Sequence, residues 1–217
     1  TTATFKGIRN GYTQVQLGLP ENQNTQLSNV ADRFLPANQN TNPFEVMMAA
    51  EVWFLRAEGA LKGWNMGSGT AKSFYEKGIE TSMKQWGITD AAKISAYISS
   101  TKTPIAPGDQ QNSPALSNIP VKWGATEAVQ REQIGTQKWL AVFPDGIEAW
   151  AEFRRTRFPK LYAPVNSENA DVPQGQFLRR IPFLDFEKNT NGEAVNAAVT
   201  LLGGADKANT PLWWDKN

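Results

Sequence analysis

Three carboxylates in the second half of the sequence have the residue type and spacing that acid–base chemistry would need. Asp145, Glu148 and Glu152 lie three and four residues apart, so a helix would place them near one another on its surface. Two carboxyl groups are enough to hydrolyse a glycosidic bond. Asp145 and Glu148 also have the pattern of a helix N-terminal cap, and Glu152 lies three residues before Arg155. We therefore expect structural roles for them, and a carboxylate-based glycosidase is the weakest functional hypothesis.

The sequence contains no Cys and no His, which removes most other catalytic chemistry. A Cys/His zinc site, a thiol nucleophile, a Ser-His-Asp triad and an imidazole base all require one of these residues. Residues 187–192 resemble the start of an EF-hand calcium loop. That loop would begin with Glu187 and would have Ala198 at its twelfth position, where a bidentate carboxylate is needed. The sequence predicts no metal, no cofactor and no catalytic residue.

Tryptophan is the unusual feature of the composition, with eight in 217 residues. Five follow helical patterns of apolar residues and are expected in the core: Trp53, Trp64, Trp86, Trp139 and Trp150. Four other aromatic residues lie in polar, Pro-containing segments: Trp123, Tyr162, Trp213 and Trp214. A ring exposed in such a segment can stack on the apolar face of a sugar. We select Trp123 and Tyr162 as ligand-binding candidates and expect both to be exposed and to contribute little to the core.

The charge balance and the lengths of the apolar runs exclude two further classes of protein. The chain has 22 basic and 21 acidic residues, so no net field attracts nucleic acid. No apolar run approaches the roughly 18 residues of a membrane span, and the first residues lack the layout of a signal peptide. We expect a soluble chain, as given, that binds no nucleic acid.

The elements that must position these residues are mainly helices. Residues 1–42 are rich in Asn, Gln, Thr and Gly and are expected to be irregular, with one short helix near 27–35. Asn42, Pro43 and Glu45 have the pattern of a cap, a first-turn proline and a capping-box partner. This pattern predicts a helix from there to Gly63 that is apolar almost all the way round and therefore buried.

A second helix is predicted to begin after Thr70 and to end at Gly87, with a shorter helix near 91–99. Two helices joined by a Gly-rich turn form a hairpin similar to a tetratricopeptide unit, and Gly78 permits close approach of its neighbour. Residues 43–100 thus form a helix hairpin and a following helix. The hairpin is expected to pack through aromatic and aliphatic residues, namely Trp53, Phe54, Phe74, Ile79 and Trp86.

The rest of the chain alternates long loops with helices. Residues 101–125 form a Pro-rich loop, which we mark as a candidate binding loop because long irregular segments in compact domains are commonly functional. Residues 126–217 contain helices and C-terminal loops. Helices are predicted at 126–142, from Asp145 to Thr156 and from about Thr190 to Leu201, and a short strand is predicted at 176–181. The fold class is mainly α with long loops.

Five segments, in order between residues 43 and 215, resemble the C-terminal half of SusD/RagB-type proteins. They are EVWFLRAE at 51–58 with GW at 63–64, QKWLAVFPDG at 137–146, EAWAEFRRT at 148–156, RIP at 180–182 with Glu187 and Asn191, and LGGAD at 202–206 with PLWWD at 211–215. The resemblance implies a SusD-like α superhelical fold of tetratricopeptide-like helix pairs, of which residues 1–217 would be the C-terminal part of one domain.

The resemblance also implies a function. SusD/RagB-type proteins are outer-membrane lipoproteins of Bacteroidetes-type bacteria that bind oligosaccharides or other nutrients, without catalysis, on the extracellular face of the cell. They deliver the ligand to a SusC-like TonB-dependent transporter. Family members begin with a lipidated Cys and further helix pairs that this sequence lacks, so the resemblance implies that the sequence is a fragment without its lipid anchor. No binding residue carries over, because the family's sugar-contacting aromatics vary. The alternative is a helical scaffold that binds only other proteins.

Overall fold

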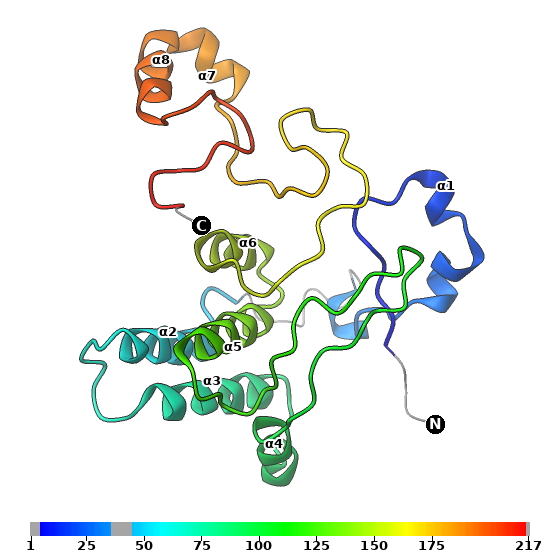
Figure 1. Cartoon of the computed structure of the whole chain (residues 1–217), viewed down its shortest axis with the longest axis vertical. Coiled ribbons are helices and arrows are strands. Elements are labelled where there is room, and N and C mark those ends of the chain that lie inside the picture. Colours follow the sequence, from blue (N-terminus) through cyan, green and yellow to red (C-terminus); the bar gives the residue numbers. More distant parts are fainter. Residues whose placement is uncertain (1–4, 36–44, 216–217) are drawn as a thin grey trace. The chain divides into compact units, whose positions relative to one another are not determined.

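The computed structural model describes residues 5–35 and 45–215, which form helices, turns and loops without any β-strand (Figure 1). The mainly α fold class is therefore confirmed. The chain divides into two compact units, one of residues 30–161 and the other of residues 1–29 with 162–217. None of the helices in the described ranges is both long and apolar enough to cross a membrane.

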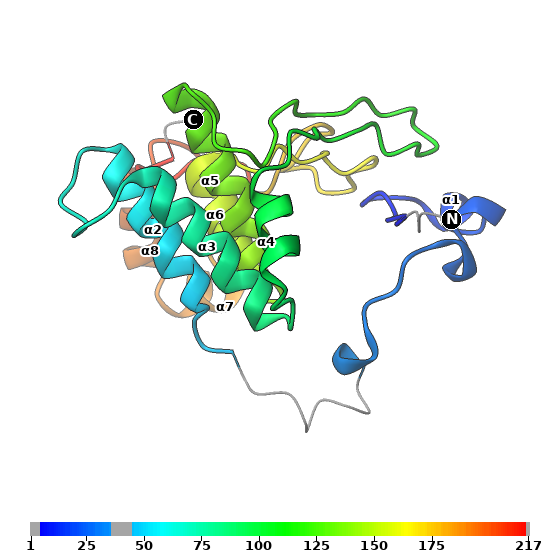
Figure 2. The same ribbon diagram turned by 90° about the horizontal axis from the view of Figure 1, so that it is seen from below.

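The unit of residues 30–161 is built on a helix hairpin. Its helices are α2 (Ala49–Leu61), α3 (Ala71–Gln85), α4 (Ala91–Ile98), α5 (Glu127–Ala141) and α6 (Gly146–Thr156), preceded by a single 3-10 turn, η3 (Asp32–Phe34). Helices α2 and α3 pair along their lengths, α5 packs on both, and α6 packs on α5 (Figure 2). The two predicted helices of the hairpin and the following short helix are confirmed.

Close packing of α2 on α3 depends on Gly78. A Cβ atom at this position would lie 2.7 Å from the Phe54 ring, a distance that no side chain tolerates. The expected close approach is thus confirmed. Eight buried residues from α2, α3 and α5 form the core around this contact: Ala50, Phe54, Ala57, Phe74, Tyr75, Ile79, Ile134 and Ala141.

The beginning of α2 differs from the prediction. Asn42, Pro43 and Phe44 lie outside the described residues, Glu45 is not helical, and α2 begins at Ala49 without a side-chain cap. The helix is also not buried all round, since Val52 is 43% and Leu55 38% exposed. Its buried residues recur at helical spacing on the one face that meets α3 and α5.

The core assignment of the five tryptophans is wrong for Trp64 and incomplete for the others. Trp64 is 63% exposed, because Gly63, with φ of +77°, reverses the chain and turns the next residue away from the helix. The remaining four are half-buried. Trp86 packs against Phe34 and Phe143 at ring-centroid distances of 5.7 and 6.1 Å.

The predicted helix starts are confirmed where a side chain caps the helix. The Thr70 hydroxyl accepts a hydrogen bond from the backbone of Ser73, and Thr126 accepts one from Val129. The Asp145 carboxylate accepts the N–H groups of Ile147 and Glu148, as the sequence pattern predicted. Capping is a local interaction, which explains why the sequence located these starts correctly.

The unit of residues 1–29 and 162–217 contains short helices. They are α1 (Gln14–Leu17), the 3-10 turns η1 (Pro20–Asn22) and η2 (Asn24–Gln26), α7 (Asp185–Thr190) and α8 (Gly192–Leu201). Helix α8 confirms the predicted last helix, whereas α7 was not predicted and occupies most of the segment that resembled a calcium loop.

Two predicted elements are wrong. The helix near 27–35 is absent, because Ser28 is paired with Lys6 by two hydrogen bonds of 2.8 and 2.9 Å that keep this segment extended, and only η3 is helical there. The strand at 176–181 is also absent. The backbone N–H groups of Arg179 and Arg180 both donate to the Ala208 carbonyl, which leaves no ladder to a second strand.

Candidate binding site

The C-terminal end of the Pro-rich loop is fastened to the core by Gln133 of α5. The side-chain amide of Gln133 donates to the carbonyls of Pro120 and Lys122, both at 2.8 Å, and its oxygen accepts the Gly124 N–H at 3.0 Å. Gln133 is only 1% exposed. One buried amide therefore forms hydrogen bonds with three backbone groups of the loop. These bonds fix the residues on either side of Trp123.

Trp123 is half-buried, which corrects the expectation that it is exposed. Its ring lies 4.9 Å from the ring of Tyr75, and it packs against the buried core. The Tyr75 hydroxyl in turn donates to the Val121 carbonyl at 2.7 Å, and burial raises the pKa of Tyr75. Trp123 therefore contributes to packing and leaves only part of its indole open to a ligand.

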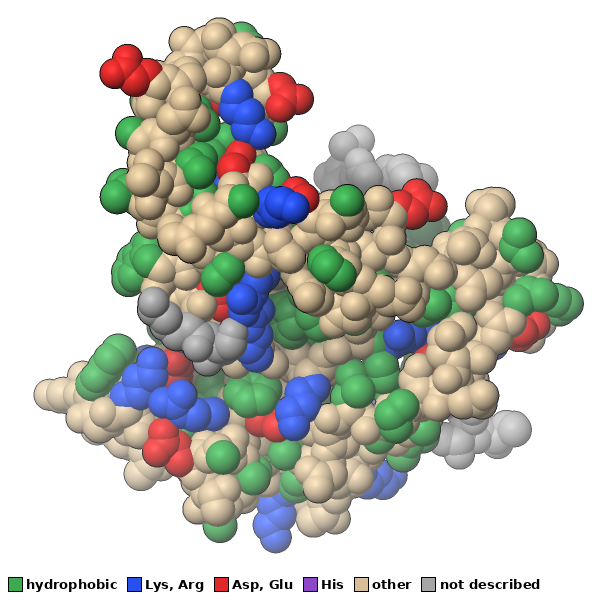
Figure 3. All heavy atoms as spheres, turned by 45° about the horizontal axis from the view of Figure 1, so that its top comes forward, with side chains coloured by type: hydrophobic (Ala, Val, Ile, Leu, Met, Phe, Trp, Pro, Cys, Tyr) green, Lys and Arg blue, Asp and Glu red, His purple; other side chains and the backbone are tan. Residues whose placement is uncertain are grey.

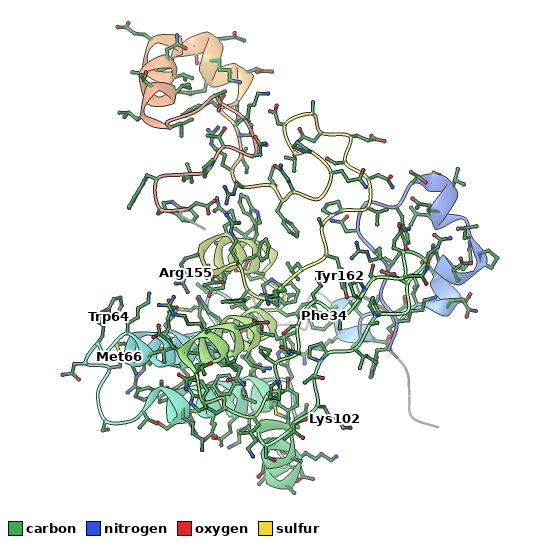
Figure 4. All side chains as sticks on the ribbon, viewed as in Figure 1. Phe34, Trp64, Met66, Lys102, Arg155 and Tyr162 are labelled. Atoms are coloured by element: carbon green, nitrogen blue, oxygen red, sulfur yellow. The ribbon has the colours of Figure 1, made fainter. Side chains whose placement is uncertain are left out.

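Tyr162, the second candidate, is also half-buried and is the first residue of the segment 162–217 of the other unit (Figure 4). The Arg9 guanidinium lies 4.3 Å from the centre of its ring, and Arg9 donates to the Ala163 carbonyl at 3.1 Å. The arginine therefore holds the phenol ring from one side. A ligand would reach the parts of the ring that remain exposed.

The first part of the Pro-rich loop is open to solvent. All residues from 101 to 108 are exposed, and Ile105 is 85% exposed. Closer to α5 the loop is tied down, since the Ser117 hydroxyl donates to the Glu132 carboxylate at 2.5 Å. The candidate binding loop thus combines an exposed stretch with a fixed base.

Two of the three carboxylates that opened the sequence argument, Glu148 and Glu152, meet Glu51 around Lys138, a residue that the sequence analysis did not select. Its ammonium group lies 2.9 Å from Glu152, 3.2 Å from Glu51 and 3.4 Å from Glu148. Burial alone would lower the pKa of Lys138, but the carboxylates of Glu152 and Glu51 outweigh it and raise the pKa. Lys138 is four residues after Ile134 and three before Ala141, so its position on the buried helix face was the available signal.

The expected pairing of Glu152 with Arg155 is confirmed at 2.9 Å. Arg155 also makes a two-pronged contact with Glu58 of α2, at 2.7 and 2.6 Å. Burial opposes ionisation of Glu58, but hydrogen bonds from Arg155 and Lys62 lower its pKa to about 2. These pairs tie α6 to the C-terminal end of α2.

A cavity of about 350 Å³ lies beside this network, between the N-terminal end of α2 and the junction of α5 and α6. Its walls are Val46, Met47, Met48 and Val142, together with four acidic residues, Glu45, Glu51, Asp145 and Glu148. Burial and the nearby Glu51 raise the pKa of Glu148, while Lys138 opposes the rise. Asp145 is already occupied as the cap of α6. The carboxylates of Glu51, Asp145 and Glu148 are thus engaged in ion pairs or a helix cap.

Comparison with models of known protein families matches this chain to one family. A family model described as Susd and RagB outer membrane lipoprotein matches residues 1–215. A search among curated proteins gives no match.

Solved structures that are similar to this chain are also SusD homologues. A chitin-binding SusD homologue from Flavobacterium johnsoniae is 44% identical over 79% of this chain, with a TM-score of 0.70. A SusD-like protein from Bacteroides thetaiotaomicron is 42% identical over 82% of the chain, with a TM-score of 0.71. A SusD homologue from Bacteroides vulgatus is 34% identical over 98% of the chain, with a TM-score of 0.82. The chain spans 36%, 38% and 43% of these structures, respectively.

Proposed function

The chain belongs to the SusD/RagB family of outer membrane lipoproteins, and on this premise we propose that it is part of a surface protein that binds glycans without catalysis. The observation that carries the proposal is its similarity to a homologue described as chitin-binding. The ligand class is therefore an oligosaccharide. The location we propose is the extracellular face of the outer membrane, with delivery of the glycan to a SusC-like TonB-dependent transporter.

The state of the carboxylates supports binding rather than hydrolysis. A glycosidase needs one carboxyl that gives up a proton and a second that acts as base or nucleophile. Glu51, Glu148 and Glu152 share the single ammonium group of Lys138, and Glu152 is also paired with Arg155. Groups held in ion pairs are poorly placed to exchange protons with a sugar.

Trp123 and Tyr162 remain the proposed ligand contacts within this function. Each ring is held on one side by the protein, Trp123 by Tyr75 and Tyr162 by Arg9. A ring fixed in this way loses little conformational freedom when a sugar stacks on its accessible part. We propose that each ring, within its own unit, contacts a sugar through its exposed edges and faces.

A protein-binding role has support of its own in the lobe of α7 and α8. Large apolar side chains are exposed there, including Leu184 at 68%, Phe186 at 75% and Leu201 at 87% (Figure 3). Exposed apolar groups of this size are typical of protein contact surfaces. An apolar contact surface is compatible with binding to a transporter and also with the alternative, a helical scaffold that binds other proteins.

Isothermal titration against chitohexaose, maltohexaose, xylohexaose and laminarihexaose tests the proposal. We expect heat of binding with at least one of these glycans and no release of new reducing ends during prolonged incubation. Binding of none would favour the scaffold. Steady release of reducing sugar that Glu148→Gln abolishes would instead identify a glycosidase.

A further inference from the structure

The turn between α2 and α3 displays Trp64, which belongs to the GW pair of the family resemblance and is not among the proposed ligand contacts. Trp64 is 63% exposed and projects from the end of the hairpin, while Met66, two residues later, lies beneath it against α2 (Figure 4). An exposed indole leaves a large apolar surface in water. The turn that carries it is nevertheless held in one conformation.

Met66 anchors the turn. Its side chain fills the space beside Gly59, where a Cβ atom would lie 2.6 Å from the Met66 sulfur, so a larger residue at position 59 would displace Met66. The Arg56 side chain donates two hydrogen bonds to the Met66 carbonyl, at 3.1 and 2.8 Å. The Arg56 guanidinium is itself held over the rings of Trp53 and Phe74, 4.7 and 4.2 Å from their centres.

The backbone on both sides of Trp64 is fixed as well. The Trp64 N–H donates to the Gly59 carbonyl at 2.9 Å, which closes the end of α2. Gly63 and Gly67 have φ of +77° and +84°, which side chains other than glycine rarely adopt. The Gly67 N–H donates to the Asn65 side-chain oxygen at 3.1 Å.

The indole itself is oriented by a cation. The Lys62 ammonium lies 5.2 Å from the centre of the Trp64 ring and forms an ion pair with Glu58 at 2.9 Å. Glu58 is in turn bound by Arg155, so the cation beside the ring is fixed to the body of the unit. The contact leaves most of the indole in solvent.

We propose that Trp64 is a stacking platform for a pyranose ring of the glycan, an inference that rests on the proposed function and adds a binding position to it. The C–H face of a pyranose packs on the electron-rich face of an indole. Asn65 uses its oxygen within the turn, so its amide N–H groups can donate to sugar hydroxyls. Because the turn is held by Met66, Arg56 and two glycines, the ring is preorganised and loses little entropy on binding.

Nuclear magnetic resonance of the whole chain tests this inference, because each of the eight tryptophans gives one indole N–H signal. The signal that disappears in Trp64→Ala belongs to Trp64. During titration with the four hexasaccharides used above, this signal should shift with the glycan that binds. Trp64→Ala should weaken that binding by at least about tenfold, and Trp64→Phe by less.

The matched control is Phe5→Ala, which removes another exposed aromatic side chain, 87% exposed, from outside the turn. It should leave the affinity within about twofold of the wild type. If the wild type binds a glycan while the Trp64 signal stays still and Trp64→Ala binds equally well, the inference fails and the proposed function stands. If the wild type binds none of the four glycans, both fail.

Discussion

At the scale of single residues, Lys138 is a buried cation that forms ion pairs with several carboxylates. It is 3% exposed and lies within 3.4 Å of three carboxylates from α2 and α6. A buried ion pair adds little over an apolar core, but removal of one partner leaves uncompensated charge. Removal of the Lys138 ammonium group should therefore destabilise the folded protein.

Lys138→Met should lower the free energy of unfolding by about 3–5 kcal/mol, because Glu51, Glu148 and Glu152 would repel one another without the ammonium group. Urea denaturation measures this loss. The matched control is Lys72→Met, which breaks an exposed helix-surface pair with Glu76 at 3.7 Å and should change stability by less than about 0.5 kcal/mol. Equal effects of the two substitutions would contradict the structural role of Lys138.

The lowered pKa of Glu58 predicts that the stability of the protein depends on pH. The Glu58 pKa is lowered from 4.5 to about 2 in the folded state, so the folded protein holds this proton less tightly than the unfolded chain. The stability contributed by ionised Glu58 is present above pH 4.5 and is lost as the pH falls towards 2. Melting temperatures of the wild type and Glu58→Gln should differ at pH 6 and converge as the pH falls below 4. A constant difference down to pH 2 would contradict this assignment.

Trp123 is expected to have two roles, because it is half-buried against Tyr75. Trp123→Ala should lower the free energy of unfolding by about 1–3 kcal/mol, less than a fully buried tryptophan would cost. It should also weaken glycan binding if the exposed part of the ring contacts the sugar. Comparison of denaturation with isothermal titration separates the two effects, and an unchanged affinity would remove Trp123 from the site.

At the scale of elements, the hairpin of α2 and α3 is specified by shape rather than by hydrophobicity alone. Its helices approach closely because Gly78 of α3 faces the Phe54 ring of α2. A helix interior ordinarily disfavours glycine by about 1 kcal/mol relative to alanine. The close approach that glycine permits outweighs this local cost.

Gly78→Ala should therefore destabilise the protein by about 1–3 kcal/mol, because its Cβ would overlap the Phe54 ring. Gly146→Ala is the control, since a Cβ at the start of α6 meets no atom within 4 Å. This second substitution should be neutral or stabilising by up to about 1 kcal/mol. Thermal unfolding of both variants gives the comparison, and a neutral Gly78→Ala would mean that the two helices separate easily.

At the scale of the whole molecule, the buried core is concentrated in one unit. All eight residues of the main core cluster lie between residues 50 and 141, inside the unit of residues 30–161. The other unit is built from short helices and loops with few buried apolar side chains. Its conformation depends more on hydrogen bonds and ion pairs, such as those of Arg179 with Asp215 and of Arg180 with Asp206.

A protein of residues 30–161 alone should therefore fold. We expect helical circular dichroism and a cooperative thermal transition, because this segment retains every residue of the core cluster and of the Lys138 network. A gradual, non-cooperative melt would show that residues 162–217 or 1–29 are required for the core. Residues 162–217 alone, the counterpart measurement, should melt without a clear transition.

The sequence by itself determined the features that depend on neighbouring residues. Caps at Thr70, Thr126 and Asp145 and glycine stops at Gly63 and Gly87 act within one helical turn, so the pattern located α3 at both ends, the starts of α5 and α6 and the end of α2. The absence of Cys and His likewise limited the chemistry before any fold was known.

Only the tertiary structure decided which side chains are buried and which charges meet. Lys138 and Glu51 are 87 positions apart in the sequence, and helix periodicity cannot indicate that separate helices bring them to 3.2 Å. The burial of Trp64 and of Trp123 could not be predicted from the sequence either, and the two predictions were wrong in opposite ways. Trp64 was expected in the core and is exposed by the turn after α2, whereas Trp123 was expected in solvent and packs on Tyr75. Burial depends on which surfaces meet across the fold, and such contacts leave no local pattern in the sequence.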